Sequence, residues 1–339
     1  MEKSQGVMMA RVDKKNKPSQ RRKTVPKKEK ARESDWILRR TGSLRILEAP
    51  AISTFDWLVH GFSTRPGGTS KMKGAGGGNG KSNGGALNLG FTEWDDRSTV
   101  LENRGKFFGA LGAERMRVVV LRQIHSDSIH RVDSSRPEVI ESWPQGDALI
   151  TNEPGILLTI QTADCVPILL ADAKNRVVAA IHAGWRGTVR RIAEKALGRM
   201  QMEFGTKPAE VVAALGPAIG PCCYEVGAEV AKEFADQFPK ARDWFEGPIE
   251  ALATGDPHDA DPNWLPWLTM KPPGHAPEPP RVKLDLIAAN RAIVAAAGVP
   301  ANQISSSGYC TACRTDLFFS YRRERETGRM MAAIGIADI

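Results

Sequence analysis

Thr159 to Thr188 read TIQTADCVPILLADAKNRVVAAIHAGWRGT, and the rest of the chain is organised around this run. Two apolar segments, Val166–Leu170 and Val177–Ile181, flank the turn-like sequence DAKNR, a pattern typical of two strands joined by a hairpin. Cys165 precedes the first segment and His182 follows the second. Because antiparallel pairing brings these two ends together, the run predicts a thiolate and an imidazole at one place.

A glycine-containing turn follows the hairpin. Gly184 and Gly187 bracket Arg186, and a helical pattern runs from Thr188 to Met200. Backbone N–H groups at a helix start can face an anion, and the helix dipole adds partial positive charge there. Arg186 and the helix start at Gly187 are therefore candidates to hold phosphate. A surface arginine at a tight turn is the equal alternative.

The excess positive charge belongs to the N-terminal residues. The chain of 339 residues has a formal charge of +8, and residues 1–34 hold twelve Lys/Arg against four Asp/Glu. The remaining residues are neutral overall, so this charge says nothing about what the folded part binds. The scarcity of apolar residues predicts a basic disordered tail over 1–38, favoured as a solvated extension over a nucleic-acid contact. Residues 39–339 are expected to form one domain.

The five cysteines indicate a reducing compartment. Their odd number, without an apolar signal segment, argues for free thiols and a cytoplasmic protein. No apolar run approaches a membrane span, so no membrane partner is expected. Cys222, Cys223, Cys310 and Cys313 could in principle hold a zinc ion. Adjacent cysteines rarely point at one metal, however, so core thiols are favoured.

Periodicity and composition place other elements. Asp285–Ala297 reads as a helix with Asp285 at its N-cap, and Val211–Leu215 and Met330–Ile336 read as apolar strands. Two segments interrupt this order. They are a flexible glycine-rich loop over 67–85 and a long irregular insertion, rich in Pro and Trp, over 239–281.

Three residues at strand ends are candidate metal ligands. His125 follows a strand as His182 does, and Cys165 precedes one. Sulfur and imidazole suit zinc, and three protein ligands leave a fourth coordination position, as in catalytic sites. A buried thiol beside a hydrogen-bonded core histidine is the alternative. A cysteine hydrolase, with Cys165 as nucleophile and His182 as base, is a further one.

Two more polar residues lie at strand ends. Asp164 is a candidate general base or partner of a metal ligand, with a simple turn residue as the alternative. His60 is a candidate proton shuttle, or else an imidazole that caps a strand. Both stay open on the residues alone.

Nine motifs lie in order between His60 and Arg329. They are HGFSTRPGG (60–68), ALNLG (86–90), RQIHS (122–126), GDALIT (146–151), TADCVPILL (162–170), HAGWRGT (182–188), GPAIGPCCYEVG (216–227), LDLIAANRAIVAAAGV (284–299) and CTACRTDLFFSYRRERETGR (310–329). Together they resemble the laccase-domain, YfiH-type family, once called polyphenol oxidases and now regarded as purine nucleoside phosphorylases. HAGWRG with TADC and IGPCCYEVG is highly specific. The basic tail, the glycine-rich loop and the 239–281 insertion are not part of that pattern.

The resemblance implies a fold, a metal and an activity. The fold is a single α+β domain, a layered αββα arrangement with mixed β-sheets. The metal is zinc, held by the residues that match His125, Cys165 and His182. The activity is phosphorolysis of adenosine, inosine and S-methyl-5'-thioadenosine to the free base and (methylthio)ribose 1-phosphate, with adenosine deamination. The implied partners are purine nucleosides and phosphate, and both a monomer and a homodimer stay open.

The matching motifs also suggest roles for single residues. His60, Asp164 and Arg186 are candidate catalytic residues. Where the family often reads Tyr-Arg-Arg-Asp, this chain has Glu324 after Arg323, a departure at the position of that carboxylate. The candidates for substrate binding are Arg65, Asn88, Gly184 and Gly187.

The older family name suggests a copper-dependent polyphenol oxidase as a rival. Several copper ions need many imidazole ligands, and six histidines are too few for that chemistry. A nucleic-acid-binding module rests on residues 1–34 alone.

Overall fold

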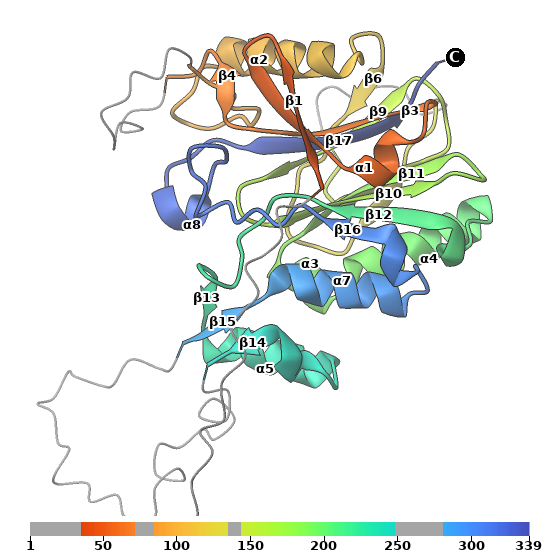
Figure 1. The fold of residues 1–339 in the computed structure, drawn as a ribbon, viewed down its shortest axis with the longest axis vertical. Helices are drawn as coiled ribbons and strands as arrows, with labels where there is room; N and C mark the ends of the chain where they lie inside the picture. The colour runs from red at the N-terminus through yellow and green to blue at the C-terminus, as the bar shows by residue number, and fades with distance from the viewer. Residues whose placement is uncertain (1–34, 72–84, 135–143, 248–280, 339) are drawn as a thin grey trace, which may run out of the picture. The chain divides into compact units, whose positions relative to one another are not determined.

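The computed structural model describes residues 35–71, 85–134, 144–247 and 281–338, and two mixed sheets stack face to face within them (Figure 1). Strand β17 lies in the middle of the first sheet, paired antiparallel with β3 and β9, while β6 runs parallel to β9. The order in this sheet is β1 (Ile37–Thr41), β2 (Leu44–Glu48), β3 (Leu58–Ser63), β17 (Met330–Ile336), β9 (Ile156–Thr162) and β6 (Arg117–Val119).

The predicted hairpin forms the centre of the second sheet. Its two strands are antiparallel, and two pairs nearer the edges, β12 with β16 and β7 with β8, are parallel. The order is β16 (Ile304–Ser306), β12 (Val211–Leu215), β10 (Val166–Asp172), β11 (Val177–Ala183), β8 (Ala148–Thr151) and β7 (Ile129–Arg131).

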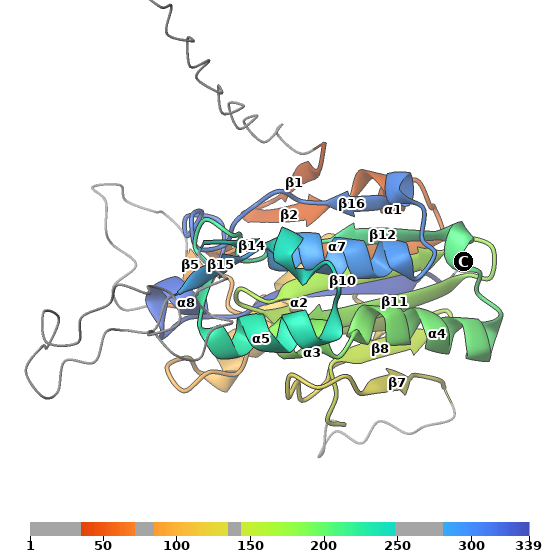
Figure 2. The same cartoon turned by 90° about the horizontal axis from the view of Figure 1, so that it is seen from below.

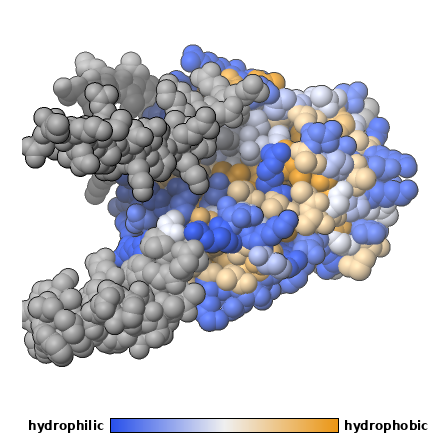
Figure 3. All heavy atoms as spheres, turned by 60° about the horizontal axis from the view of Figure 1, so that its bottom comes forward, coloured by the Kyte–Doolittle hydropathy of each residue, from blue (hydrophilic) through white to orange (hydrophobic). Residues whose placement is uncertain are grey.

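Helices cover the outer faces of both sheets, so the α+β prediction of a layered αββα fold is confirmed (Figures 1 and 2). On the first sheet, Phe107 of α2 packs with Leu157 and Ala333. On the second, apolar residues of several helices share one core with the sheet, and hydrophilic residues lie among hydrophobic ones on the surface (Figure 3). The helices are α2 (Arg97–Leu111), α3 (Trp185–Val189), α4 (Ile192–Phe204), α5 (Ala228–Gln237) and α7 (Leu286–Ala296).

Short elements complete the described chain. No helix within these residues is both long enough and apolar enough to cross a membrane. The short helices are α1 (Pro50–Ser53), α8 (Tyr321–Glu324), and the 3-10 turns η1 (Pro208–Glu210), η2 (Ala241–Trp244) and η4 (Ala301–Gln303). The short strands are β4 (Pro66–Gly68), β5 (Gly85–Ala86), β13 (Glu225–Val226), β14 (Phe245–Glu246) and β15 (Val282–Leu284).

The hairpin is buried on both faces, which explains its continuous apolar runs. Ile168 and Ile181 belong to the core beneath the helices, whereas Leu169 and Ala180 belong to the core between the sheets. A strand covered on both sides needs no polar face. The register pairs Pro167 with His182, so the two predicted chemical ends do meet.

The helix expected over 188–200 is wrong as a single element. It divides into α3 and α4, because Arg191 has a φ of 59° in the left-handed region and interrupts the helical hydrogen bonding. The helix expected to begin at Asp285 is confirmed, since its carboxylate accepts the Ala288 N–H at 2.8 Å.

Two segment boundaries in the structure differ from those expected from the sequence. β1 begins at Ile37, just before the expected boundary at residue 39, and the preceding Trp36 is buried against Phe62 with ring centroids 5.1 Å apart. The 239–281 insertion includes η2 and β14, which pairs with β15, so its start is regular rather than irregular. The rest of that insertion, and most of the loop expected over 67–85, lie outside the described residues.

Candidate active site

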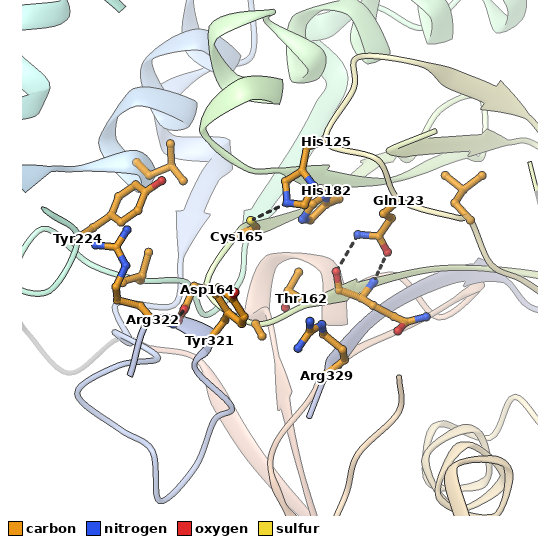
Figure 4. A pocket seen from close by; sticks show the side chains of 15 residues that line it. Gln123, His125, Thr162, Asp164, Cys165, His182, Tyr224, Tyr321, Arg322 and Arg329 are labelled. Atoms are coloured by element: carbon orange, nitrogen blue, oxygen red, sulfur yellow. Dashed lines mark hydrogen bonds between the residues drawn. The ribbon is translucent and has the colours of Figure 1, made fainter. Parts of the chain in front are cut away.

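A pocket opens where strand ends from both sheets meet. Its volume is about 630 Å³, within the range of roughly 300–1,000 Å³ typical of small-molecule sites. Figure 4 shows side chains from distant parts of the sequence around this space. The residues that line it are Leu121, Gln123, His125, Gln161, Thr162, Ala163, Asp164, Cys165, His182, Ile219, Tyr224, Leu286, Tyr321, Arg322 and Arg329.

The three predicted metal ligands converge in this pocket. The donor atoms of His125, Cys165 and His182 all lie within 4.8 Å of one another. The Cys165 Sγ is 3.9 Å from the His125 Nε2, and the two imidazole rings meet edge to face with centroids 5.0 Å apart. His125 is exposed and His182 is buried, so the three donor atoms are accessible from the side of His125. Such a donor set with an open side is the arrangement of a catalytic zinc site.

Asp147 holds two of these ligands in place. Its fully buried carboxylate accepts the Nδ1–H of His182 at 2.8 Å, which leaves the Nε2 of that ring facing the cluster. It also accepts the backbone N–H groups of Ile124, His125 and Ser126 at 2.6–3.3 Å, and the Ser126 hydroxyl at 2.7 Å. These bonds fold the backbone around the carboxylate and hold His125 at a φ of 57°.

Cys165, His182 and Asp147 stabilise one another's charged forms. Burial alone would raise the pKa of the Cys165 thiol, but the nearby His182 and the hydrogen bond with His125 lower it to about 6. Burial alone would lower the pKa of His182, yet the Cys165 thiolate and the Asp147 carboxylate raise it to about 9. The pKa of Asp147 falls to about 2, because its hydrogen bonds with His182 and Ser126 outweigh burial. The two imidazoles therefore favour the thiolate form of Cys165, which is the form that binds metals.

Asp164 lies beside Cys165 in the pocket lining, at a φ of 98°. This conformation costs energy for a residue with a side chain. Its Oδ1 accepts the Thr311 hydroxyl and its Oδ2 accepts the Arg322 N–H, both at 2.6 Å. The carboxylate thus fixes the C-terminal loop to the hairpin and faces the pocket at the same time.

Arg186 lies outside the pocket lining. Its exposed side chain rests over the Trp185 ring at 4.5 Å. Gly187 lies inside α3, and Gly184 lies next to Cys165 and His125, two of the candidate metal ligands. A Cβ on Gly184 would come to 3.0 Å from the Cys165 Sγ and from the His125 ring, so a larger residue there would push against both side chains.

Three other candidate site residues lie outside the pocket lining and bond to other parts of the protein. The Nε2 of His60 accepts the Ala49 N–H at 3.0 Å, as expected of the capping alternative. Arg65 forms an ion pair with Glu324 at 2.7 Å, so the glutamate that departs from the family pattern has a partner. The Oδ1 of Asn88 accepts the Arg329 N–H at 2.9 Å, which positions a pocket residue.

Several pocket residues were missed on the sequence alone. Gln123 exchanges two hydrogen bonds with the backbone of Gln161, at 2.7 and 2.8 Å (Figure 4). Arg322 lies over the Tyr224 ring at 5.0 Å, and Arg329 adds a second guanidinium. These residues fall within the motifs quoted above, yet nothing in their spacing shows that they share one pocket.

The chain is similar in sequence to a known family of proteins. A family model described as multi-copper polyphenol oxidoreductase laccase matches residues 59–337. The chain is 36% identical over 287 residues to the purine nucleoside phosphorylase YlmD of Geobacillus stearothermophilus, covering 83% of this chain and 91% of the relative. It is 36% identical over 234 residues to the adenosine deaminase RL5 of an unknown prokaryotic organism, covering 68% and 78%.

Two solved structures share the fold. The structure of YlmD from Geobacillus stearothermophilus superposes with a TM-score of 0.68 at 32% identity, over 89% of this chain and 100% of that one. The Bacillus licheniformis hypothetical protein YfiH superposes with a TM-score of 0.67 at 29% identity, over 89% and 98%. The layered sheets that carry the pocket are therefore common to these proteins.

Proposed function

This chain belongs to the multi-copper polyphenol oxidoreductase laccase family, and on that basis we propose that it is a zinc-dependent purine nucleoside phosphorylase with adenosine deaminase activity. The substrates would be adenosine, inosine and S-methyl-5'-thioadenosine, together with phosphate. The names of two relatives support both reactions. The observation that carries the proposal is the convergence of His125, Cys165 and His182 in a pocket that Arg329 also lines.

The residues present fit zinc better than a copper cluster. Two imidazoles and one thiolate form the donor set, and Asp147 fixes the tautomer of His182. Among the described histidines, His60 and His130 lie outside this pocket lining, so few imidazoles are at hand for several copper ions. When bound, zinc supplies Lewis-acid polarisation and lowers the pKa of water.

The protein's own groups supply the rest of the proposed chemistry. Asp164 faces the pocket, and each carboxylate oxygen accepts one protein hydrogen bond, so a lone pair on each stays available to receive a substrate proton. Tyr224, buried and beside Arg322, offers an aromatic surface for a purine base.

We assign phosphate binding to Arg329 rather than Arg186. Arg329 lines the pocket, and the two hydrogen bonds that its guanidinium donates to described residues, at 3.3 and 3.1 Å, both use Nη1. Nη2 and Nε are then free to hold a phosphate by two parallel bonds. Burial lowers the pKa of Arg329, and the charges of Cys165 and Asp164 act in the opposite direction, which agrees with a cation facing those groups.

The test separates the two reactions in one assay. Zinc-loaded protein is incubated with adenosine at fixed phosphate, and adenine, ribose 1-phosphate and inosine are measured. Arg329→Ala should slow phosphorolysis about tenfold to a hundredfold, the loss of roughly 1.5–3 kcal/mol of charge-assisted bonding, and should slow inosine formation much less. Arg186→Ala is the matched control, because it also removes a guanidinium, but one that lies outside the pocket lining.

The outcomes discriminate between the sites. If Arg186→Ala alters the ratio of adenine to inosine and Arg329→Ala does not, phosphate binds at the start of α3, as the sequence pattern first indicated. If zinc-loaded parent protein forms neither adenine nor inosine, the proposed function is wrong.

The low pKa of Cys165 favours one other function, a cysteine hydrolase with His182 as base. The metal-free protein decides between the two. A hydrolase would be active without zinc and inactivated by iodoacetamide at Cys165, whereas the proposed phosphorylase would require zinc.

A further inference from the structure

Four cysteines form a second group of donor atoms outside the pocket lining. Cys222 and Cys223 lie in the loop after β12, and Cys310 and Cys313 lie in the loop after β16. Their four sulfur atoms all lie within 4.8 Å of one another. Cys222 and Cys313 are exposed, so the sequence-based preference for core thiols is wrong for these two.

The sulfur positions match a metal site better than a disulfide. The Cys313 Sγ is 3.5 Å from the Cys222 Sγ and 3.4 Å from the Cys223 Sγ. A disulfide bond is about 2.05 Å long and joins one pair of sulfurs only. Four thiolates around one zinc ion, at about 2.3 Å each, form a tetrahedron with edges of about 3.8 Å. The adjacent cysteines therefore both point at the same centre, although such pairs rarely do.

The two loops are joined by backbone bonds that hold the sulfurs together. The Thr311 N–H donates to the Ala218 carbonyl at 3.0 Å, and the Ala218 N–H donates to the Tyr309 carbonyl at 3.4 Å. The Gly220 N–H donates to the Cys310 Sγ at 3.2 Å. A backbone donor aimed at a sulfur stabilises the thiolate form that binds metal.

We propose that Cys222, Cys223, Cys310 and Cys313 bind a second zinc ion in a closed tetrathiolate site. With four protein ligands the ion has no open position, so its role is structural. Its four donor atoms are separate from those of His125, Cys165 and His182, so the proposal does not rest on the proposed catalytic function.

The ion would fix two pocket residues at their positions. Tyr224, which lines the pocket, directly follows Cys223. Thr311, between the two cysteines of the other loop, donates its hydroxyl to Asp164 at 2.6 Å. A metal that joins the loops therefore fixes the spacing between the Tyr224 ring and the Asp164 carboxylate.

The experiment counts zinc ions per chain by mass spectrometry of the full-length protein, purified under reducing conditions. The parent should hold two, one for each group of donors. Cys165→Ala should keep one, Cys313→Ser should keep one, and the double variant should hold none. Cys313→Ser is a near-isosteric change at an exposed position, and circular dichroism verifies that each variant folds.

A spectroscopic measurement identifies the ligands even where a variant folds poorly. Cobalt(II) added to metal-free Cys165→Ala protein should give the strong visible and thiolate charge-transfer bands of a tetrahedral four-sulfur site. After zinc removal and unfolding, thiol titration of the Cys165→Ala protein should find that each of its cysteines is a free thiol. Zinc absent from Cys165→Ala protein, iron in its place, or a disulfide among these cysteines would overturn the proposal.

Discussion

At the scale of single residues, Asp147 holds His125 and His182, two of the three candidate metal ligands, in place. It accepts hydrogen bonds from His182 and from the loop that carries His125, so one carboxylate orients two ligands. A carboxylate that positions a ligand typically contributes 10-fold to 100-fold to metal affinity. Such a residue acts without touching the substrate.

Asp147→Asn should weaken zinc binding at this group by about 10-fold to 100-fold, because the amide can no longer accept from every donor around it. Competition with a chromogenic chelator measures the affinity. Asp127→Asn is the control, since Asp127 pairs with Lys195 near the surface and lies two residues from His125. Equal affinities in the two variants would show that His182 needs no carboxylate to bind the metal.

We expect His60 to make the free energy of unfolding depend on pH. Burial lowers its pKa to about 4, against an ordinary value of 6.5. Between these two pH values His60 is protonated in the unfolded chain but neutral in the folded protein. The free energy of unfolding is therefore highest above pH 6.5 and decreases as the pH falls toward 4. The loss amounts to about 3 kcal/mol at most.

His60→Gln should remove this contribution, because glutamine keeps a polar group near Nε2 and does not titrate. Urea unfolding at several pH values measures it, with His130→Gln at a more accessible histidine as the control. A pH profile unchanged by His60→Gln, relative to the parent, would contradict the assignment.

The residues that could be predicted share a local pattern. Cys165 and His182 were found because they sit at the two ends of one hairpin, where pairing rules bring them together. Asp147 looks like any aspartate before a strand, and Arg329 is separated from the hairpin by the rest of the chain. Their roles depend on three-dimensional contacts that no spacing in the sequence expresses.

At the scale of elements, two glycines have opposite roles at α2, Gly105 inside the helix and Gly112 at its C-cap. Gly112 ends the helix at a φ of 72°, and its N–H bonds to the carbonyls of Gly109 and Phe108. Gly105 lies within the helix on its exposed side, and a Cβ at either position would meet nothing within 4 Å. If the alanine variants at these two positions differ in stability, the difference therefore comes from backbone conformation alone.

Gly112→Ala should destabilise the protein by about 1 kcal/mol, because alanine resists the left-handed conformation. Gly105→Ala should stabilise it by about 0.5–1 kcal/mol, since glycine is a poor residue inside a helix. Urea unfolding of both variants beside the parent gives the two changes. The same sign for both would show that contacts, rather than backbone conformation, control this helix.

Elements with strong apolar runs were predicted well for a physical reason. β17 has the bounds expected from its sequence, because a strand buried on both faces requires an uninterrupted apolar run. The break between α3 and α4 was not predicted. Arg190 and Arg191 carry no Gly or Pro signal, so nothing in the local sequence marks the left-handed backbone at Arg191.

At the scale of the whole molecule, Trp36 lies near the N-terminal end of the described residues and packs on Phe62. Removal of residues 1–34 should leave the melting temperature, zinc content and turnover unchanged, because their excess charge comes with few apolar residues. Removal of residues 1–41 also deletes β1 and the Trp36 ring that packs on Phe62. That truncation should cost about 3–5 kcal/mol, as expected for the loss of a buried aromatic side chain.

Calorimetry of the two truncated proteins and the parent measures this difference. A large drop in melting temperature after removal of residues 1–34 would show that these residues stabilise the domain. The sequence alone placed the boundary at residue 39, because an isolated tryptophan before a basic strand gives no periodic pattern.

The central position of β17 has a consequence for protein synthesis. A ribosome makes β3 and β9 early, but the strand that joins them is made after both. The nascent chain therefore carries two unpaired strand edges, which are sites of mispairing and aggregation. The hairpin of β10 and β11 needs only its own neighbours and can form during translation. The pocket also takes Tyr321, Arg322 and Arg329 from the segment just before β17, so its lining is complete only after this segment has been made.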